Sequence, residues 1–131
     1  VTYLNQYLKV NTQDDFAYFL KAKCNANLGY NDLALNDILT AEAFENSIDY
    51  AFLEGKILYN LKNFKQAEEK LKSLSGQIQN SEFYKYLGLS QAENGNKADA
   101  IINLEKSIIL SDDDKFVYSK YNELKMGIAN E

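Results

Sequence analysis

The chain has 131 residues, a formal net charge of −5 and an ordinary hydrophobic share of 46%. A chain of this length can bury one sizeable core, and its ten tyrosines and seven phenylalanines exclude a disordered segment. The acidic balance argues against nucleic acid as a partner, because phosphate binding needs a basic face.

The composition of the chain also narrows its fold class. Proline is absent and glycine occurs only six times, which favours an all-α protein broken by short turns. No apolar run is long enough to cross a bilayer, so we expect no membrane insertion. The single cysteine, Cys24, suits a reducing compartment such as the cytoplasm without excluding the periplasm, so localisation stays open. The chain begins at Val1 inside a helical pattern, which we interpret as a fragment of a longer protein.

Apolar spacing predicts a series of helices in chain order. Their expected ranges are 1–10, 15–28, 31–44, 48–61, 64–74, 81–93, 97–110 and 115–129. Gly29 is expected to close the second helix as a left-handed cap, and the acidic run 112–114 to begin the last one. In that last helix, Phe116, Tyr118 and Tyr121 are expected to contribute to one buried face.

Small side chains recur at fixed positions of these helices, at one constant interval along the chain. The first helix of each pair has Ala22, Gly55 and Gly88, and the second has Ala34, Ala67 and Ala100. An interval of this size, about 33 residues, indicates a stacked array of helix pairs. A side chain no larger than a methyl group lets two helix axes approach closely, so we expect these positions to mark the helix contacts.

On these residues the chain resembles the tetratricopeptide repeat (TPR) family, whose repeat is two antiparallel helices in about 34 residues. The resemblance implies an all-α, right-handed α-solenoid. Its parts would be a leading helix at 1–14, repeats at 15–47, 48–80 and 81–114, and a capping helix at 115–131. The family's proline between repeats is missing, and Asn46, Gln79 and Asp112 lie near its place.

The resemblance also implies a concave groove, lined by the first helices, in which partners usually bind. The residues expected to line it are Phe19, Lys23, Asn27, Phe52, Lys56, Tyr59, Asn60, Lys85, Tyr86 and Leu89. Phenylalanine, lysine and asparagine recur in phase in the first two repeats, along one helical face. Such a groove would suit a peptide with acidic and apolar side chains. In the alternative interpretation, Phe19 and Phe52 pack between adjacent repeats and the lysines extend past them.

The function implied by the resemblance is a non-catalytic protein–protein interaction module, a scaffold or adaptor without a cofactor. Histidine is absent, which removes the commonest general base and zinc ligand, and no glycine-rich phosphate loop occurs. The acidic run 112–114 lacks the glycine and distal glutamate of a calcium loop. The set of cationic and amide residues with which some family members grip a C-terminal carboxylate is not reproduced in place.

Two other functions stay open. Exposed Tyr3, Tyr7 and Leu8 on an unpaired leading helix would favour self-assembly into a homo-oligomer. The chain could also be the regulatory or docking part of a larger enzyme. Cys24 falls at a packing position, so we expect a buried structural thiol there.

Overall fold

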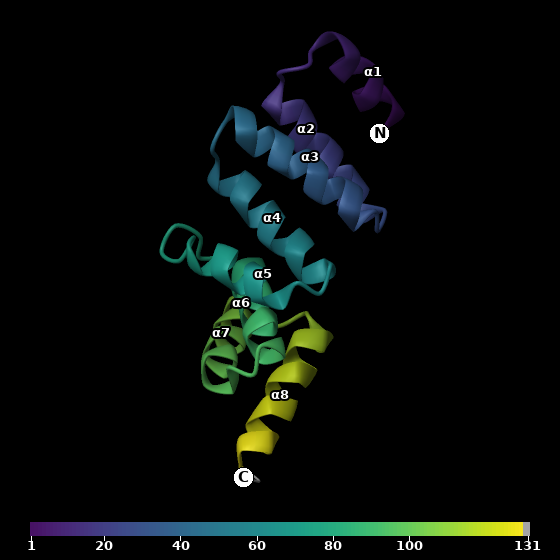
Figure 1. Cartoon of the computed structure of the whole chain (residues 1–131). Helices are drawn as coiled ribbons and strands as arrows, with labels where there is room; N and C mark the ends of the chain where they lie inside the picture. The colour runs from purple at the N-terminus through teal and green to yellow at the C-terminus, as the bar shows by residue number, and fades with distance from the viewer. Residues whose placement is uncertain (130–131) are drawn as a thin grey trace. The chain divides into compact units, whose positions relative to one another are not determined.

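The computed structural model describes residues 1–129, and these form eight helices (Figure 1). The helices are α1 (Thr2–Val10), α2 (Asp15–Asn27), α3 (Asn31–Phe44), α4 (Ile48–Asn60), α5 (Phe64–Lys72), α6 (Ser81–Glu93), α7 (Lys97–Leu110) and α8 (Lys115–Ala129). All eight lie where the apolar spacing predicts them. The largest difference is at α5, which ends two residues before the expected Leu74. The last two residues of the predicted capping helix, 130 and 131, lie outside the described residues.

Side-chain caps fix where several helices begin. The carboxylate of Asp14 accepts a hydrogen bond from the backbone N–H of Ala17 at 3.1 Å, and the side chain of Asn80 accepts one from Phe83 at 2.8 Å. At α8, Asp114 of the acidic run accepts from the N–H of Val117 at 3.2 Å, as the sequence predicts. Each bond satisfies a donor that the first helical turn would leave unpaired.

Three helices end in the same backbone motif at the repeat interval. Gly29, Lys62 and Gly95 follow α2, α4 and α6 with φ values of 84°, 64° and 85°. After each of them, a backbone N–H returns to a carbonyl five residues earlier, as in the bond from Asn63 to Leu58 at 2.9 Å. This is the left-handed C-terminal cap that glycine adopts most easily. Lys62 therefore occupies a position where the other two repeats have glycine.

We expect Lys62→Gly to raise the free energy of unfolding by up to about 1 kcal/mol, because a side chain in left-handed backbone costs about 1–2 kcal/mol and glycine's extra unfolded-state entropy offsets part of the gain. Thermal and urea unfolding would measure the change. Lys65→Gly, on the exposed side of α5, is the matched control and should be destabilising. A Lys62→Gly variant less stable than the parent would contradict the assignment.

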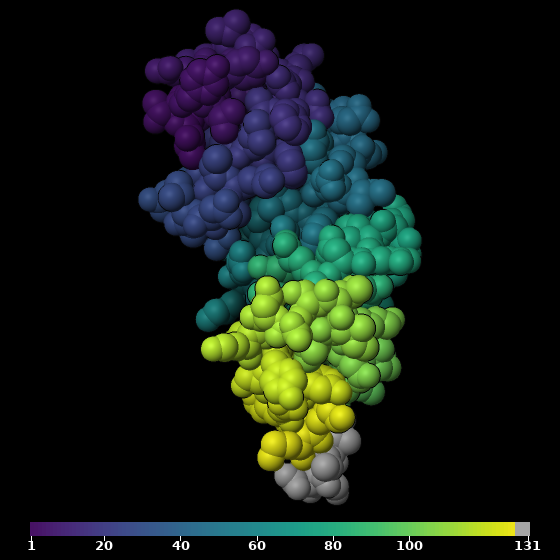
Figure 2. Space-filling view, turned by 180° about the vertical axis from the view of Figure 1, so that it is seen from behind, coloured from purple at the N-terminus to yellow at the C-terminus, as the bar shows by residue number. Residues whose placement is uncertain are grey.

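The chain divides into two compact units, residues 1–63 and 64–131, each described by itself. In unit 1, α2 packs on α3, α3 packs on α4, and α1 lies against α2 (Figures 1 and 2). The core of this unit contains Ala22, Ala34, Ile38, Ala41, Tyr50, Leu53 and Ile57. Two of the repeated small residues thus lie in one core, where α2 meets α3.

In unit 2, α6 packs on both α5 and α7, and α8 packs on α7. Gly88 lies at the α6–α7 contact, where a Cβ atom would stand 2.8 Å from Cγ of Leu104 and 3.2 Å from its backbone nitrogen. The remaining small residues of the period, Gly55, Ala67 and Ala100, are buried as well. The expectation that small residues occupy helix contacts is confirmed at Ala22, Ala34 and Gly88, which lie within single units.

The last helix does not bury the aromatic face that we expected. Phe116 is 58% exposed and Tyr118 54% exposed, whereas Val117 and Leu124 are buried. Val117 and Leu124 are seven residues apart and therefore share one side of α8. That side packs on α7, so Phe116 and Tyr118 turn away from it.

Candidate functional site

A hollow of about 290 Å³ lies between α2 and α4 of unit 1. Its lining contains Phe19 and Lys23 from α2 together with Asp49, Phe52, Leu53 and Lys56 from α4. Four of the residues that the sequence assigned to a groove are thus brought together in one concavity. Their position follows from the repeat, because Phe52 and Lys56 lie one repeat period after Phe19 and Lys23.

Each lysine of this hollow lies over the aromatic ring one helical turn before it. The Nζ atom of Lys23 is 5.4 Å from the ring centroid of Phe19, and that of Lys56 is 4.6 Å from the centroid of Phe52. Cation–π contacts of this kind contribute about 0.5–1 kcal/mol at exposed sites. They hold two ammonium groups at defined places beside an apolar floor.

The floor of the hollow is fixed by packing beneath it. The ring of Phe19 lies 4.8 Å, centroid to centroid, from the ring of Tyr50, which is buried. The hydroxyl of Tyr50 donates a 2.6 Å hydrogen bond to the carboxylate of Asp15, which ties α4 to α2. Burial, reinforced by this hydrogen bond, raises the pKa of Tyr50 to about 12. Phe19 therefore has a structural role, as the alternative interpretation expects, and also lines the hollow.

The charge in the hollow is mixed. Lys23 and Asp49 are exposed, and Lys56 is half-buried. Asp49 lies in the first turn of α4, where an acidic residue is favoured by the helix dipole. The site therefore presents two ammonium groups and one carboxylate.

The sequence missed two members of this site, Asp49 and Leu53. Both were recoverable, since Asp49 lies three residues before Phe52, and Leu53 lies three residues before Lys56, so helical spacing places them near that face. The other residues predicted in unit 1 are not among the lining residues. Asn27 and Asn60 are exposed at the ends of their helices, and Tyr59 is half-buried.

The predicted groove residues of unit 2 have different surroundings. Lys85 donates a 2.8 Å hydrogen bond to the carboxylate of Asp114, and its Nζ lies 5.5 Å from the ring centroid of Tyr86. Burial acts to lower the pKa of Lys85, but the bond and charge of Asp114 outweigh it and the pKa is raised. The bond from Lys85 is also the main reason why the pKa of Asp114 is lowered. Leu89 is only 2% exposed, so it differs from our expectation of an open lining residue.

The expectation of a buried structural thiol at Cys24 is wrong, because Cys24 is exposed. At the same repeat position, Ile57 and Ser90 are buried. The next position along the helix is buried in all three repeats, as Asn25, Leu58 and Gln91, so the repeats differ in whether a neighbouring helix covers the position of Cys24. The residue at this repeat position is therefore buried in the second and third repeats and exposed in the first.

Two polar side-chain pairs join neighbouring helices and were not predicted from the sequence. The side-chain amide of Asn25 donates a 2.8 Å hydrogen bond to Asp37, whose other oxygen lies 3.5 Å from the ammonium of Lys21. At the matching positions of unit 2, the amide of Asn103 donates to Gln91 at 2.7 Å. These pairs join the first and second helix of a repeat and have no role in the hollow.

No group of three or more potential metal-ligating side chains occurs in residues 1–129. None of the described helices has both the length and the apolar character needed to cross a membrane.

No protein-family model matches the chain, and no curated protein does either. Solved structures do match its fold. MamA (residues 41 to the end) from Desulfovibrio magneticus RS-1 superimposes with a TM-score of 0.87 at 17% identity, covering 98% of this chain and 73% of that one. YrrB, described as a TPR protein with an unusual peptide-binding site, gives a TM-score of 0.78 at 15% identity, covering 92% of this chain and 63% of its own.

The chain has the TPR fold. The fold class expected from the sequence, an all-α array of antiparallel helix pairs, is confirmed by these matches. A third TPR structure is the first TPR of Spaghetti (RPAP3) bound to the HSP90 peptide SRMEEVD, with a TM-score of 0.76 at 14% identity, covering 89% of this chain and 94% of that one.

Proposed function

We propose that this TPR chain is a non-catalytic interaction module that binds a peptide segment of a partner protein at the α2–α4 hollow. The observation that carries the proposal is the pair of lysines held over phenylalanine rings around one concavity. A scaffold or adaptor role follows, because such a surface recognises a chain and performs no chemistry on it.

The charges of the hollow indicate the chemistry of the peptide. Lys23 and Lys56 would pair with a carboxylate of the partner, and the rings of Phe19 and Phe52 would contact an apolar side chain beside it. Asp49 at the edge would accept a backbone N–H of the peptide. The preferred ligand is thus an extended segment in which acidic and apolar residues alternate.

Two structural neighbours support a peptide as the ligand. The RPAP3 TPR is bound to SRMEEVD, a peptide with acidic and apolar residues, and YrrB is described as having a peptide-binding site. They support the proposal as proteins of the same fold, and the choice of residues comes from the geometry of this chain alone.

An array of synthetic peptides tests the proposal. One half carries alternating acidic and apolar residues, and in the other half lysine replaces every acidic residue. We expect binding to the acidic half only, and Lys23→Glu and Lys56→Glu should each weaken it by at least about tenfold, since a like charge then faces the carboxylate. Titration calorimetry with the tightest peptide gives the change in Kd.

The matched control is Lys125→Glu. Lys125 also lies over an aromatic ring one turn before it, at 5.2 Å from the centroid of Tyr121, but outside the hollow. The Lys125→Glu substitution should leave peptide binding unchanged. Equal binding to both halves of the array, or equal loss in all three variants, would remove the hollow as the binding site.

A further inference from the structure

The side-chain amide of Asn94 ties α6 to α5 within unit 2. Asn94 directly follows α6 as its C-terminal cap. Its amide nitrogen donates hydrogen bonds to the backbone carbonyl of Phe64 at 3.0 Å and to the carboxylate of Glu68 at 2.7 Å. Phe64 begins α5, and Glu68 lies one turn later on the same helix. Both bonds need N–H donors, which an amide has and a carboxylate lacks.

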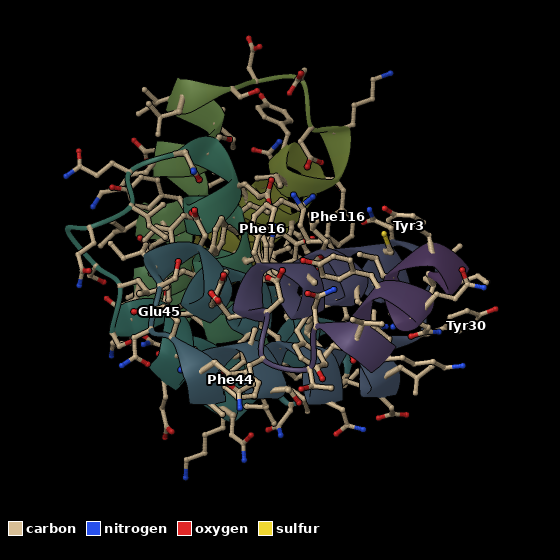
Figure 3. The ribbon with its side chains drawn as sticks, turned by 90° about the horizontal axis from the view of Figure 1, so that it is seen from above. Tyr3, Phe16, Tyr30, Phe44, Glu45 and Phe116 are labelled. Carbon is tan, nitrogen blue, oxygen red and sulfur yellow. The ribbon has the colours of Figure 1, made fainter. Side chains whose placement is uncertain are left out.

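Asn94 is also the only asparagine of the sequence that is followed by glycine. Glycine has no Cβ atom, so the backbone nitrogen of Gly95 is less hindered than that of any other residue type. The matching turns of the other two repeats have leucine at this position, as Leu28 and Leu61. The first of these turns ends at Tyr30, which lies at the start of α3 (Figure 3). The third repeat alone therefore combines a side-chain amide with an open backbone nitrogen at this turn.

An asparagine followed by such a nitrogen loses its amide without an enzyme. The backbone nitrogen of Gly95 attacks Cγ of Asn94, and the new C–N bond closes a succinimide ring. The bond from Cγ to the side-chain nitrogen breaks, and that nitrogen leaves as ammonia with the proton of the Gly95 N–H. Water then opens the ring at either carbonyl, which leaves aspartate or isoaspartate at position 94. Water is the only co-reactant.

Two features of the folded cap oppose this reaction. The amide of Asn94 is held on α5 by its two hydrogen bonds. The N–H of Gly95, which has to lose its proton, donates to the carbonyl of Ala92 at 3.1 Å. These bonds must break before the nitrogen can attack, so the reaction needs a local opening of the α5–α6 contact. Such openings occur in folded proteins, each with a free energy of its own.

We propose that Asn94 is a deamidation site that reacts when the α5–α6 contact opens and whose product weakens that contact when it closes again. Aspartate at position 94 has no side-chain N–H to donate to α5. Its carboxylate would also lie beside that of Glu68, where like charges repel. The exposed ammonium of Lys72, which lies 3.8 Å from Glu68, offsets part of that repulsion.

The isoaspartate product disturbs the cap itself. It places an extra carbon atom in the main chain, at the turn where the N–H of Asn96 donates to the carbonyl of Gln91 at 2.9 Å. Neither product reverts to asparagine, so one opening leaves a permanent change. The modification is separate from peptide binding, because the lining residues of the α2–α4 hollow all belong to unit 1.

Incubation of the parent chain at neutral pH, both folded and unfolded in guanidinium chloride, tests the reaction. Peptide mapping by mass spectrometry follows the conversion of each asparagine, and a synthetic peptide of residues 92–97 in the same two solutions corrects for any effect of the denaturant. We expect Asn94 to convert at least about tenfold faster in the unfolded chain, where the cap is always open. In denaturant it should also convert faster than the other asparagines. Equal rates at Asn94 in the folded and unfolded chain, or no faster conversion there than at other asparagines, overturn the proposal.

The variant Asn94→Asp tests the consequence. Its midpoint of chemical unfolding should be lower than that of the parent chain. It should also be lower than that of Asn27→Asp, the control, which adds the same charge at the exposed C-terminal end of α2. A parent sample deamidated in denaturant and then refolded should contain a less stable population in proportion to its conversion. A refolded sample that unfolds like fresh protein, or an Asn94→Asp variant as stable as Asn27→Asp, overturns the proposal.

Discussion

Replacing Asp37 with alanine is expected to lower the free energy of unfolding by about 1–3 kcal/mol, the range for leaving a buried hydrogen-bonding group without its partner. The amide of Asn25 is buried and donates to Asp37, so the substitution leaves that amide unpaired. Lys21 loses its acidic neighbour too, but its side chain still reaches solvent. Chemical denaturation measures the loss.

Two further variants identify the cause of that loss. Asp32→Ala removes an exposed carboxylate from the same helix and should cost less than about 1 kcal/mol. The double variant Asn25→Leu, Asp37→Leu should recover much of the stability, because apolar replacement of both partners leaves no group unpaired. The chain already has Leu58 at the matching position of the second repeat. A double variant as unstable as Asp37→Ala would show that lost packing, not the unpaired amide, is responsible.

Gly88→Ala is expected to destabilise the protein by about 1–3 kcal/mol, although alanine is the better helix former. The added Cβ would stand 2.8 Å from Cγ of Leu104 and 3.2 Å from its backbone nitrogen. Neither atom is the free end of a flexible side chain, so α6 and α7 would have to separate. Thermal unfolding gives the change in stability.

The same substitution at Gly127 is the matched control. Gly127 also lies in a helix, α8, but a Cβ added there would meet nothing within 4 Å. Gly127→Ala should therefore gain up to about 1 kcal/mol from helix propensity. If both variants were stabilised alike, close approach of α6 and α7 at Gly88 would be refuted.

Helix positions and close contacts could be predicted from the sequence because both have local signals. Helical spacing and turn residues set the helix ends. The constant interval between Ala34, Ala67 and Ala100 predicts helix contacts, and all three side chains are buried. The same interval placed Phe19, Lys23, Phe52 and Lys56 on matching faces, and the structure brings these four together.

The errors have physical causes that periodicity does not contain. An interval says which positions are equivalent, but not whether a neighbouring helix covers them, and so Cys24 is exposed where Ile57 is buried. The left-handed backbone of Lys62 was not predicted, because lysine itself gives no signal for that conformation. The Asn25–Asp37 pair was hidden because its two members are twelve residues apart, on different helices.

A charge exchange between protein and peptide tests the binding account most directly. Calorimetry would measure the Kd of two proteins, the parent chain and Lys56→Glu, for two peptides. One peptide is the tightest acidic peptide. In the other, lysine replaces the acidic residue of that peptide that contributes most to its affinity. The account predicts that either change alone weakens binding at least about tenfold, and that the two together restore it to within about tenfold of the original. If the exchanged pair binds no better than either single change, Lys56 does not pair with the peptide, and the proposed recognition is contradicted.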